Sequence, residues 1–200
     1  MIPGTRFVIS SIALAMMATI IGVCAEDKAF RPGTASDYAH QTSEQVTIGA
    51  KSYDTEELTA EAFGKKTDLL KYGVLPVLVV IENKRQKTLD LRNLEVNLVA
   101  ADGRHAGPVS PEDVPFLGKR AKVPTMNPIP NPLPKKKNPL NAPQIVERAF
   151  AAKMLPPGDS TSGFFYFEAK PEAGDKLYLN GLRDTPSGQE MLYFEFPLQK

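Results

Sequence analysis

Beyond its first 25 residues, the most apolar segment of the chain is the short run 74–82, with the sequence VLPVLVVIE. Its length and its many β-branched residues favour a strand over a helix. Because polar residues hardly interrupt the run, we expect a central strand that is covered on both faces. Pro76 cannot donate a ladder hydrogen bond, so we expect it near the start of this strand or at a bulge.

Other segments alternate between apolar and polar positions, which is typical of strands with one buried face. In the clearest of them Leu94, Val96 and Leu98 point to one side, and Glu95 and Asn97 point to the other. Turn residues separate these segments, so that the last two form a hairpin. The further strands that we predict lie at 45–50, 163–169, 176–182 and 190–198.

Helical patterns are short and few. The expected segments are a helix over 54–72 that breaks at Gly64, a turn within 110–118, and a helix over 142–151 that leads into a short strand ending at Leu155. Asp54 is a suitable N-cap for the first helix. Asn141 and Gln144 have the spacing of a capping box before the third. The chain is therefore predicted to be mainly β, an antiparallel immunoglobulin-like β-sandwich with two or three short helices.

Two polar stretches fall outside this pattern. Residues 26–44 are polar and aperiodic, so we expect a flexible N-terminal tail before a β-sandwich domain that spans 45–200. Residues 121–143 contain seven prolines, which neither a helix nor the interior of a sheet can hold. We expect a long extended loop there.

The first 25 residues have the pattern of a secretory signal peptide. Residues 1–6 carry one positive charge, Arg6, residues 7–23 carry no charge, and small residues precede a cut after Ala25. The sequence therefore predicts an exported protein, which is periplasmic, held at the cell surface or secreted.

Cys24 leaves three hypotheses open. It leaves with the signal peptide, it is the acylated first residue of a lipoprotein, or the apolar run stays uncleaved as an anchor. Cleavage after Ala25 removes Arg6 and no acid, so that 23 basic residues face 23 acidic ones. The mature chain then has no cysteine, which excludes disulfides, thiol catalysis and cysteine-bound metals.

The sequence contains no constellation typical of an enzyme. Its two histidines, His40 and His105, lie in the expected tail and beside the Asp-Gly turn, and no nucleophile elbow or phosphate-binding loop occurs. Asp102, Glu112 and Asp113 are close in sequence but lack the spacing of a calcium loop. We therefore predict no cofactor, no metal site and no enzymatic activity, with a hydrolase of unrecognised type as an alternative.

A basic cluster flanks and interrupts the proline-rich loop. We interpret it as a contact with an envelope protein or an anionic surface, or as lysines that keep the loop soluble. A neutral, exported chain is not expected to bind nucleic acid, and it would meet the membrane only through a lipid or an uncleaved anchor. The six residues are Lys119, Arg120, Lys122, Lys135, Lys136 and Lys137.

Three tyrosines on predicted strands suggest a second kind of surface. Tyr166, Tyr178 and Tyr193 could line an aromatic face for a sugar or a partner. Ordinary cross-strand packing is the alternative, because tyrosine is common on the outer faces of sheets.

Three motifs, GVLPVLVVIENK, LEVNLVAADGRH and MLPPGDSTSGFFYF, are similar to those of secreted bacterial immunoglobulin-like β-sandwich domains in uncharacterised envelope or lipoprotein-type proteins. The resemblance covers roughly residues 45–198. It implies the fold and the compartment and carries no catalytic residue. In its terms we expect a left-handed turn at Asn83, positive φ at Gly103 and Gly158, and core positions at Phe165 and Phe167.

Together these features predict an exported, non-enzymatic interaction or accessory protein of the cell envelope, with the 121–143 loop as its contact surface. A small-ligand or carbohydrate-binding module, using an aromatic sheet face or the loops at one end, is the alternative.

Overall fold

The computed structural model describes residues 30–117, 138–185, 187–191 and 193–198. The predicted signal peptide, Cys24, the six residues of the basic cluster and most of the proline-rich loop lie outside these ranges. Within them, no helix has both the length and the apolar character needed to cross a membrane.

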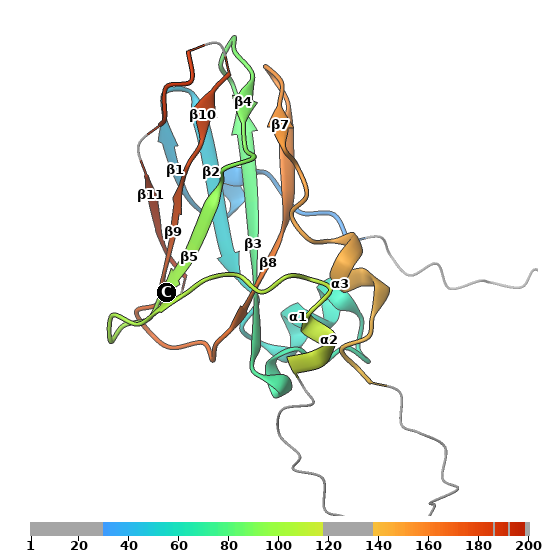
Figure 1. Cartoon of the computed structure of the whole chain (residues 1–200). Helices are drawn as coiled ribbons and strands as arrows, with labels where there is room; N and C mark the ends of the chain where they lie inside the picture. Colours follow the sequence, from blue (N-terminus) through green and yellow to red (C-terminus); the bar gives the residue numbers. More distant parts are fainter. Residues whose placement is uncertain (1–29, 118–137, 186, 192, 199–200) are drawn as a thin grey trace, which may run out of the picture.

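Two four-stranded sheets pack face to face, and a small third sheet lies at one end (Figure 1). The first sheet has the order β1 (Ala39–Ser43), β2 (Val46–Ser52), β3 (Val74–Asn83), β8 (Ser160–Glu168). The second has the order β11 (Phe194–Pro197), β9 (Lys176–Asn180), β5 (Glu95–Val99), β6 (His105–Ala106). The third consists of β10 (Arg183–Asp184), β4 (Leu89–Asp90) and β7 (Met154–Leu155). All these pairings are antiparallel, so the predicted mainly-β sandwich is confirmed, while its immunoglobulin-like class stays a prediction.

Short helices cover the outer face of the first sheet near one end (Figure 1). They are α1 (Glu56–Phe63), α2 (Val114–Leu117), α3 (Pro143–Glu147) and the 3-10 turns η1 (Ala35–Asp37) and η2 (Leu70–Tyr72). The N-cap of α1 is Thr55, whose hydroxyl accepts the N–H of Leu58 at 3.3 Å. The predicted cap, Asp54, instead accepts a hydrogen bond from the hydroxyl of Ser52 at 3.1 Å.

The third helix is shorter than the predicted 142–151, and the expected capping box is absent because Ala142 is its N-cap. The chain leaves the helix after Glu147 and runs along the edge of β8. There the N–H of Phe150 donates to the carbonyl of Phe164 at 3.0 Å, and the N–H of Phe164 donates to the carbonyl of Arg148 at 2.8 Å. Pairing with a sheet edge thus replaces the last helical turns.

The central strand β3 divides the apolar residues into two cores, as its uniform hydrophobicity predicts. Alternate residues point between the two large sheets, where they meet Leu98, Leu177 and Phe196. The others point to the helical side, where they meet Phe63 and Phe164. β3 is therefore covered on both faces, which explains why its sequence shows so little alternation.

The predicted core aromatics are partly confirmed. Phe167 is buried between the sheets, but Phe165 is only half-buried and stacks on Phe150 with ring centroids 5.1 Å apart. Gly103 and Gly158 have the expected positive φ, 84° and 81°. Asn83 does not, since Glu44 and Gln45 are the only described non-glycine residues with positive φ.

The prediction of a flexible tail over 26–44 is wrong for the part that the structure describes. All five residues of β1 pair with β2, through a two-residue hairpin turn at Glu44 and Gln45. Upstream, the N–H of Ala35 donates to the Glu82 carboxylate at 2.8 Å, and its backbone lies against Gly49, where a Cβ atom would clash with it. The missing side chain of Gly49 is what allows this segment to pack on the sheet.

The two large sheets are joined along one pair of edges and separate along the other. On the closed side the side-chain amide of Gln41 makes two hydrogen bonds to the backbone of Glu195 in β11. It donates to the carbonyl at 2.7 Å and accepts the N–H at 3.1 Å. On the other side lie the edge strands β6 and β8, and the chain crosses between them to Val109, whose N–H donates to the carbonyl of Tyr166 at 2.7 Å. The candidate site lies on this second side.

Candidate binding site

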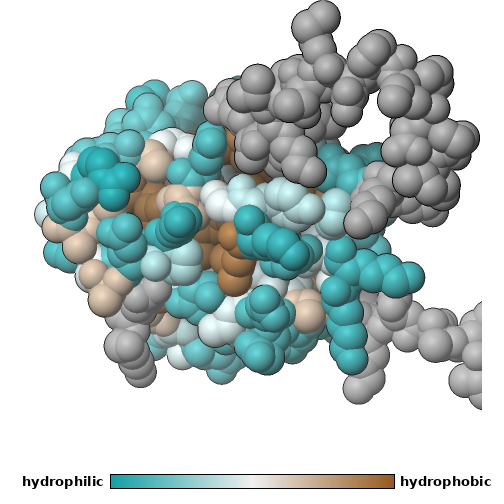
Figure 2. Space-filling model, turned by 90° about the horizontal axis from the view of Figure 1, so that it is seen from below, coloured by the Kyte–Doolittle hydropathy of each residue, from teal (hydrophilic) through white to brown (hydrophobic). Residues whose placement is uncertain are grey.

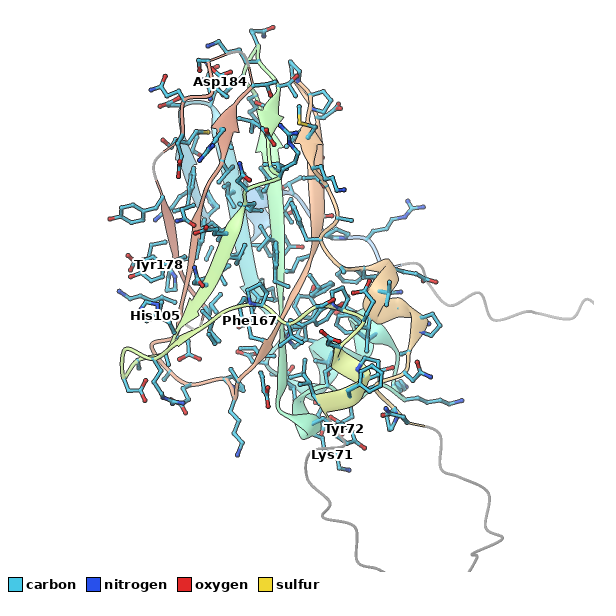
Figure 3. All side chains as sticks on the ribbon, viewed as in Figure 1. Lys71, Tyr72, His105, Phe167, Tyr178 and Asp184 are labelled. Atoms are coloured by element: carbon cyan, nitrogen blue, oxygen red, sulfur yellow. The ribbon has the colours of Figure 1, made fainter. Side chains whose placement is uncertain are left out.

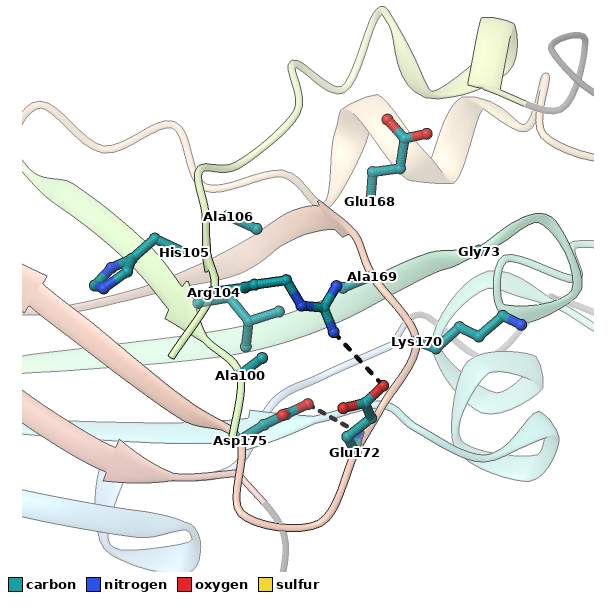
Figure 4. A pocket seen from close by; sticks show the side chains of 11 residues that line it. Gly73, Ala100, Arg104, His105, Ala106, Glu168, Ala169, Lys170, Glu172 and Asp175 are labelled. Carbon is teal, nitrogen blue, oxygen red and sulfur yellow. Dashed lines mark hydrogen bonds and ion pairs between the residues drawn. The ribbon is translucent and has the colours of Figure 1, made fainter. Parts of the chain in front are cut away.

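A hollow of about 570 Å³ lies at the end of the sandwich between the β5–β6 hairpin and the segment that follows β8 (Figure 4). Its apolar floor consists of Gly73, Leu98, Ala100, Ala106 and Ala169. Its polar rim carries both positive and negative side chains and consists of Arg104, His105, Glu168, Lys170, Glu172 and Asp175. We call this the charged hollow. Figure 2 views this end of the molecule and shows hydrophobic surface framed by hydrophilic side chains.

One wall of the charged hollow is built by the Asp-Gly turn that the sequence predicts. Gly103 takes the positive φ that the turn requires, and the N–H of Ala100 donates to the carbonyl of Arg104 at 2.9 Å. The carboxylate of Asp102 accepts the backbone N–H of Arg104 at 3.0 Å. The turn therefore holds the Arg104 side chain at the mouth of the hollow.

The guanidinium of Arg104 lies among carboxylates. Its Nε donates to Asp102 at 2.6 Å, and this hydrogen bond holds the pKa of Asp102 below its usual range. Its Nη2 is 3.9 Å from a carboxylate oxygen of Glu172, a longer and weaker contact. Both the Arg104 and the Glu172 side chains are largely exposed, so this second pair contributes little to stability.

Asp175 lies at the opposite wall, directly before β9, and is only 2% exposed. One of its carboxylate oxygens accepts the backbone N–H of Glu172 at 2.9 Å. Its backbone is fixed by the N–H of Leu198, which donates to the Asp175 carbonyl at 3.0 Å. The other carboxylate oxygen is buried and has no hydrogen-bond partner among the residues that the structure describes. Buried acceptors of this kind are rare in folded proteins.

Neither histidine shows the surroundings expected of a catalytic base. His105 lies exposed on β6, and its imidazole points away from the Arg104 guanidinium (Figure 4). His40 is exposed on β1, with Nδ1 2.9 Å from the carbonyl of Tyr38. In the described part of the chain, no three or more His, Cys, Asp or Glu residues are grouped so that they could hold a metal ion.

The three tyrosines do not form one face. Tyr166 is buried in the core under the helices, where its hydroxyl donates to the carbonyl of Ile145 at 2.7 Å and burial raises its pKa. Tyr178 and Tyr193 do pack together on the outer face of the second sheet, with ring centroids 6.4 Å apart. This pair fits the simpler interpretation, cross-strand packing.

Sequence reasoning singled out Asp102 and His105 one at a time but assigned no role to Arg104, Glu172 or Asp175. The available signal was a charged residue directly after each of two turn glycines. Arg104 follows Gly103, and Asp175 follows Gly174 directly before a strand. Such residues are common at turns. Nothing in the local pattern says that these two turns lie side by side.

Comparison with known proteins gives weak likenesses. No protein-family model matches the chain, and no curated protein matches it. Among solved structures, a protein from Bacillus subtilis described as a candidate lipoprotein is 13% identical with a TM-score of 0.40, and the alignment covers 80% of this chain and 38% of that one. The secreted protein MPT63 from Mycobacterium tuberculosis is 15% identical with a TM-score of 0.35, over 82% and 95% of the two chains. This chain thus spans well under half of the first structure. At TM-scores below 0.5, neither likeness carries an argument about function.

Proposed function

We propose that this protein is an exported, non-enzymatic binding module of the cell envelope and that the charged hollow is its binding site. The observation that carries the proposal is the combination at one place of a concave apolar floor and a charged rim, with a buried Asp175 oxygen that lacks a partner. Ligand sites in proteins typically combine an apolar lining with a few convergent polar groups.

The scaffold supports a binding role. The walls of the hollow are the β5–β6 hairpin and a turn tied to β11 through Leu198, so the polar groups are held by paired strands. A site on such elements is positioned before its ligand arrives, which lowers the entropy cost of binding. The exposed position of His105, without an acid hydrogen-bonded to its imidazole among the described residues, supports a role other than catalysis.

The test is a thermal-shift screen of the exported chain against chemically diverse small molecules, including sugars, amino acids, amines and organic acids. A ligand that binds only the folded state raises the melting temperature. The proposal expects at least one such ligand, and it expects Ala106→Leu, which fills the floor, to abolish the shift. Ala151→Leu, an exposed substitution of equal size outside the hollow, is the control. A screen without hits, or hits that survive Ala106→Leu, would contradict the proposal.

Export is supported by the residue pattern of the first 25 positions. The intact mass of the native protein tests it directly. A chain that starts at Glu26 is processed and soluble, and an acylated chain that starts at Cys24 is tethered. A mass that includes Met1 and the residues after it would contradict processing.

A contact through the basic cluster is a second proposal, supported by six cations gathered around a proline-rich segment. Replacing Lys135, Lys136 and Lys137 by serine should weaken capture of an envelope protein or of vesicles that contain anionic lipid. Unchanged capture of both the envelope protein and the vesicles would show that the basic cluster is not a contact surface.

A further inference from the structure

We propose, on the basis of the proposed function of the charged hollow, that its ligand is a small aliphatic amino acid in its zwitterionic form. The ammonium group is held by Glu172 and attracted by the negative charge of Asp175, and the carboxylate is held by Arg104. The side chain rests on the floor of alanines. Each part of this assignment rests on a separate observation.

The buried carboxylate of Asp175 favours a cationic group on the ligand. One oxygen is occupied by the backbone N–H of Glu172, and the other has no partner among the described residues. The rim cation that interacts electrostatically with Asp175 is Arg104, but its Nε is already bound to Asp102. A primary ammonium group on the exposed Glu172 carboxylate balances this buried charge through space, because the remaining Asp175 oxygen itself has almost no accessible surface.

The ion pair between Arg104 and Glu172 favours a ligand that also carries a negative group. Its atoms are 3.9 Å apart, and both side chains are largely exposed, so the pair is weak and separates at small cost. The two charges of a zwitterion can replace this ion pair, each binding one of its two members. The ligand carboxylate binds the guanidinium and the ligand ammonium binds Glu172 beside Asp175, so that both members of the pair keep a partner of opposite charge. A ligand without the ammonium leaves Glu172 without a partner, whereas a ligand without the carboxylate leaves Arg104 paired with Asp102 alone.

The floor sets the size of the ligand. Three of its side chains are the methyl groups of Ala100, Ala106 and Ala169, and these leave space above the buried Leu98. Such a surface suits a short branched aliphatic side chain, which removes apolar area from water when it is covered. Large aromatic or charged side chains would lie outside the floor, against the charged rim.

The experiment uses the exported chain, labelled with ¹⁵N, and four matched probes. They are L-valine, N-acetyl-L-valine, isobutylamine and 3-methylbutanoate. These share one aliphatic skeleton and differ in which charge they carry. The readout is the backbone amide resonance of Glu172, whose N–H is bonded to Asp175, followed through a titration to millimolar concentrations.

Valine is expected to bind and to shift this resonance. N-acetylvaline and 3-methylbutanoate, which lack the ammonium, are expected to bind at least roughly tenfold more weakly, as is typical when one charged hydrogen bond is lost. Isobutylamine, which lacks the carboxylate, is expected to lie between them. Equal binding of valine and N-acetylvaline would overturn the proposal, and so would the absence of valine binding.

Two variants test whether the ligand binds in the charged hollow. Asp175→Asn keeps the size of the side chain but removes its charge, and it should weaken valine binding roughly tenfold or more. Asp113→Asn, an exposed aspartate outside the hollow, should leave it unchanged. If Asp175→Asn does not fold, Ala169→Leu keeps the carboxylate and fills the floor, and it should also abolish binding. Retained valine affinity in the folded Asp175→Asn or Ala169→Leu protein would overturn the assignment.

The outcome separates this inference from the proposed function. If valine does not bind but another molecule of the screen does, and Ala106→Leu abolishes that binding, the hollow is a binding site with a different ligand. If no molecule binds there, both proposals fail.

Discussion

Each end of the sandwich has an aspartate that is buried to the same degree, but the two are surrounded differently. Asp184 and Asp175 are both 2% exposed, and one oxygen of each carboxylate lacks a partner among the described residues. Figure 3 shows Asp184 at the end opposite His105. Its second oxygen accepts a hydrogen bond from Lys87 Nζ at 2.7 Å and lies 3.5 Å from Arg85 Nη2. The second oxygen of Asp175 accepts a backbone N–H, and no cationic side chain of the described residues hydrogen-bonds to it.

This difference separates a structural carboxylate from a candidate binding group. Lys87 lowers the pKa of Asp184 through its hydrogen bond, so the charge of Asp184 is compensated within the fold. Asp184 also ties β10 to the loop before β4, where Asn83 fixes the chain further. Asp175 lines a hollow, and the fold leaves its charge less compensated. Residues that serve function rather than stability often have this character.

The largest effect is expected from Asn83 at the Asp184 end. Its side-chain amide is buried and donates to the carbonyls of Lys87, Leu155 and Pro156 at 2.8, 3.0 and 3.0 Å. Asn83→Ala removes the amide donor from these carbonyls, of which that of Pro156 keeps the N–H of Asp159 at 3.3 Å, and it should lower the free energy of unfolding by about 2–4 kcal/mol, measured by chemical denaturation.

Asn97→Ala is the control, because Asn97 lies half-buried on the outer face of β5. Its loss of stability should be within about 0.5 kcal/mol. If the two variants are equally stable, the clamp at Asn83 does not hold this end together.

A direct comparison of the two aspartates gives the next largest effect. Asp184→Asn should lower the melting temperature clearly, because it leaves Lys87 and Arg85 near a group that no longer balances them. Asp175→Asn should lower it less or raise it, since no side-chain cation loses a hydrogen bond there. The reverse order, measured by calorimetry on both variants, would mean that Asp175 is the structural residue.

The sequence predicts the elements that depend on local residue patterns and misses those that depend on contacts between distant residues. β3, β5, β9 and β11 follow from runs and alternation, because a strand with a buried face needs apolar residues at every second position. The pairing of β9 with β11 follows in the same way, although β10 lies between them in the chain. Each of these strands is therefore predicted from its own residues and from the turn beside it.

The elements that were missed depend on contacts between distant residues. β1 is too polar to show a buried face, and its turn uses Glu44 and Gln45 instead of the Asn-Gly typical of such hairpins. Gly49 within an apolar strand was the one local sign that another backbone packs there.

The sequence predicts a left-handed turn at Asn83, but two of the three carbonyl partners of its side chain lie 72 and 73 residues away. The charged hollow likewise joins the turns at Gly103 and Asp175, which no local pattern brings together.

Acid should weaken the Asp184 end through two carboxyls, those of Asp90 and Asp184. The guanidinium of Arg92 hydrogen-bonds to Asp90 on β4 and lowers the pKa of that carboxyl to about 2, and the pKa of Asp184 is lowered as well. A carboxyl with a lowered folded pKa stabilises the fold above its ordinary value of 3.8 and loses this contribution as the pH falls through the folded value. The melting temperature should therefore fall as the pH drops from about 4 towards 2.

Asp90→Asn should flatten this dependence, and its effect at neutral pH should be smaller than that of Asp184→Asn, because Arg92 is largely exposed. Thermal unfolding followed by circular dichroism across this range measures both. An unchanged acid dependence in Asp90→Asn would show that this pair does not contribute.

The smallest effect on stability, and the sharpest one on function, is expected from Arg104. Lys87 and Arg85 balance a buried charge at one end, whereas Arg104 pairs at the other end with exposed carboxylates and is itself exposed. Arg104→Gln should therefore leave the melting temperature within experimental error. In the charged hollow, however, it removes the group assigned to the ligand carboxylate. Valine should then bind no better than isobutylamine, while the affinity for isobutylamine stays the same or rises because a competing cation is gone. A loss of stability, or an undiminished preference for valine, would place Arg104 with the structural cations and remove the distinction between the two ends.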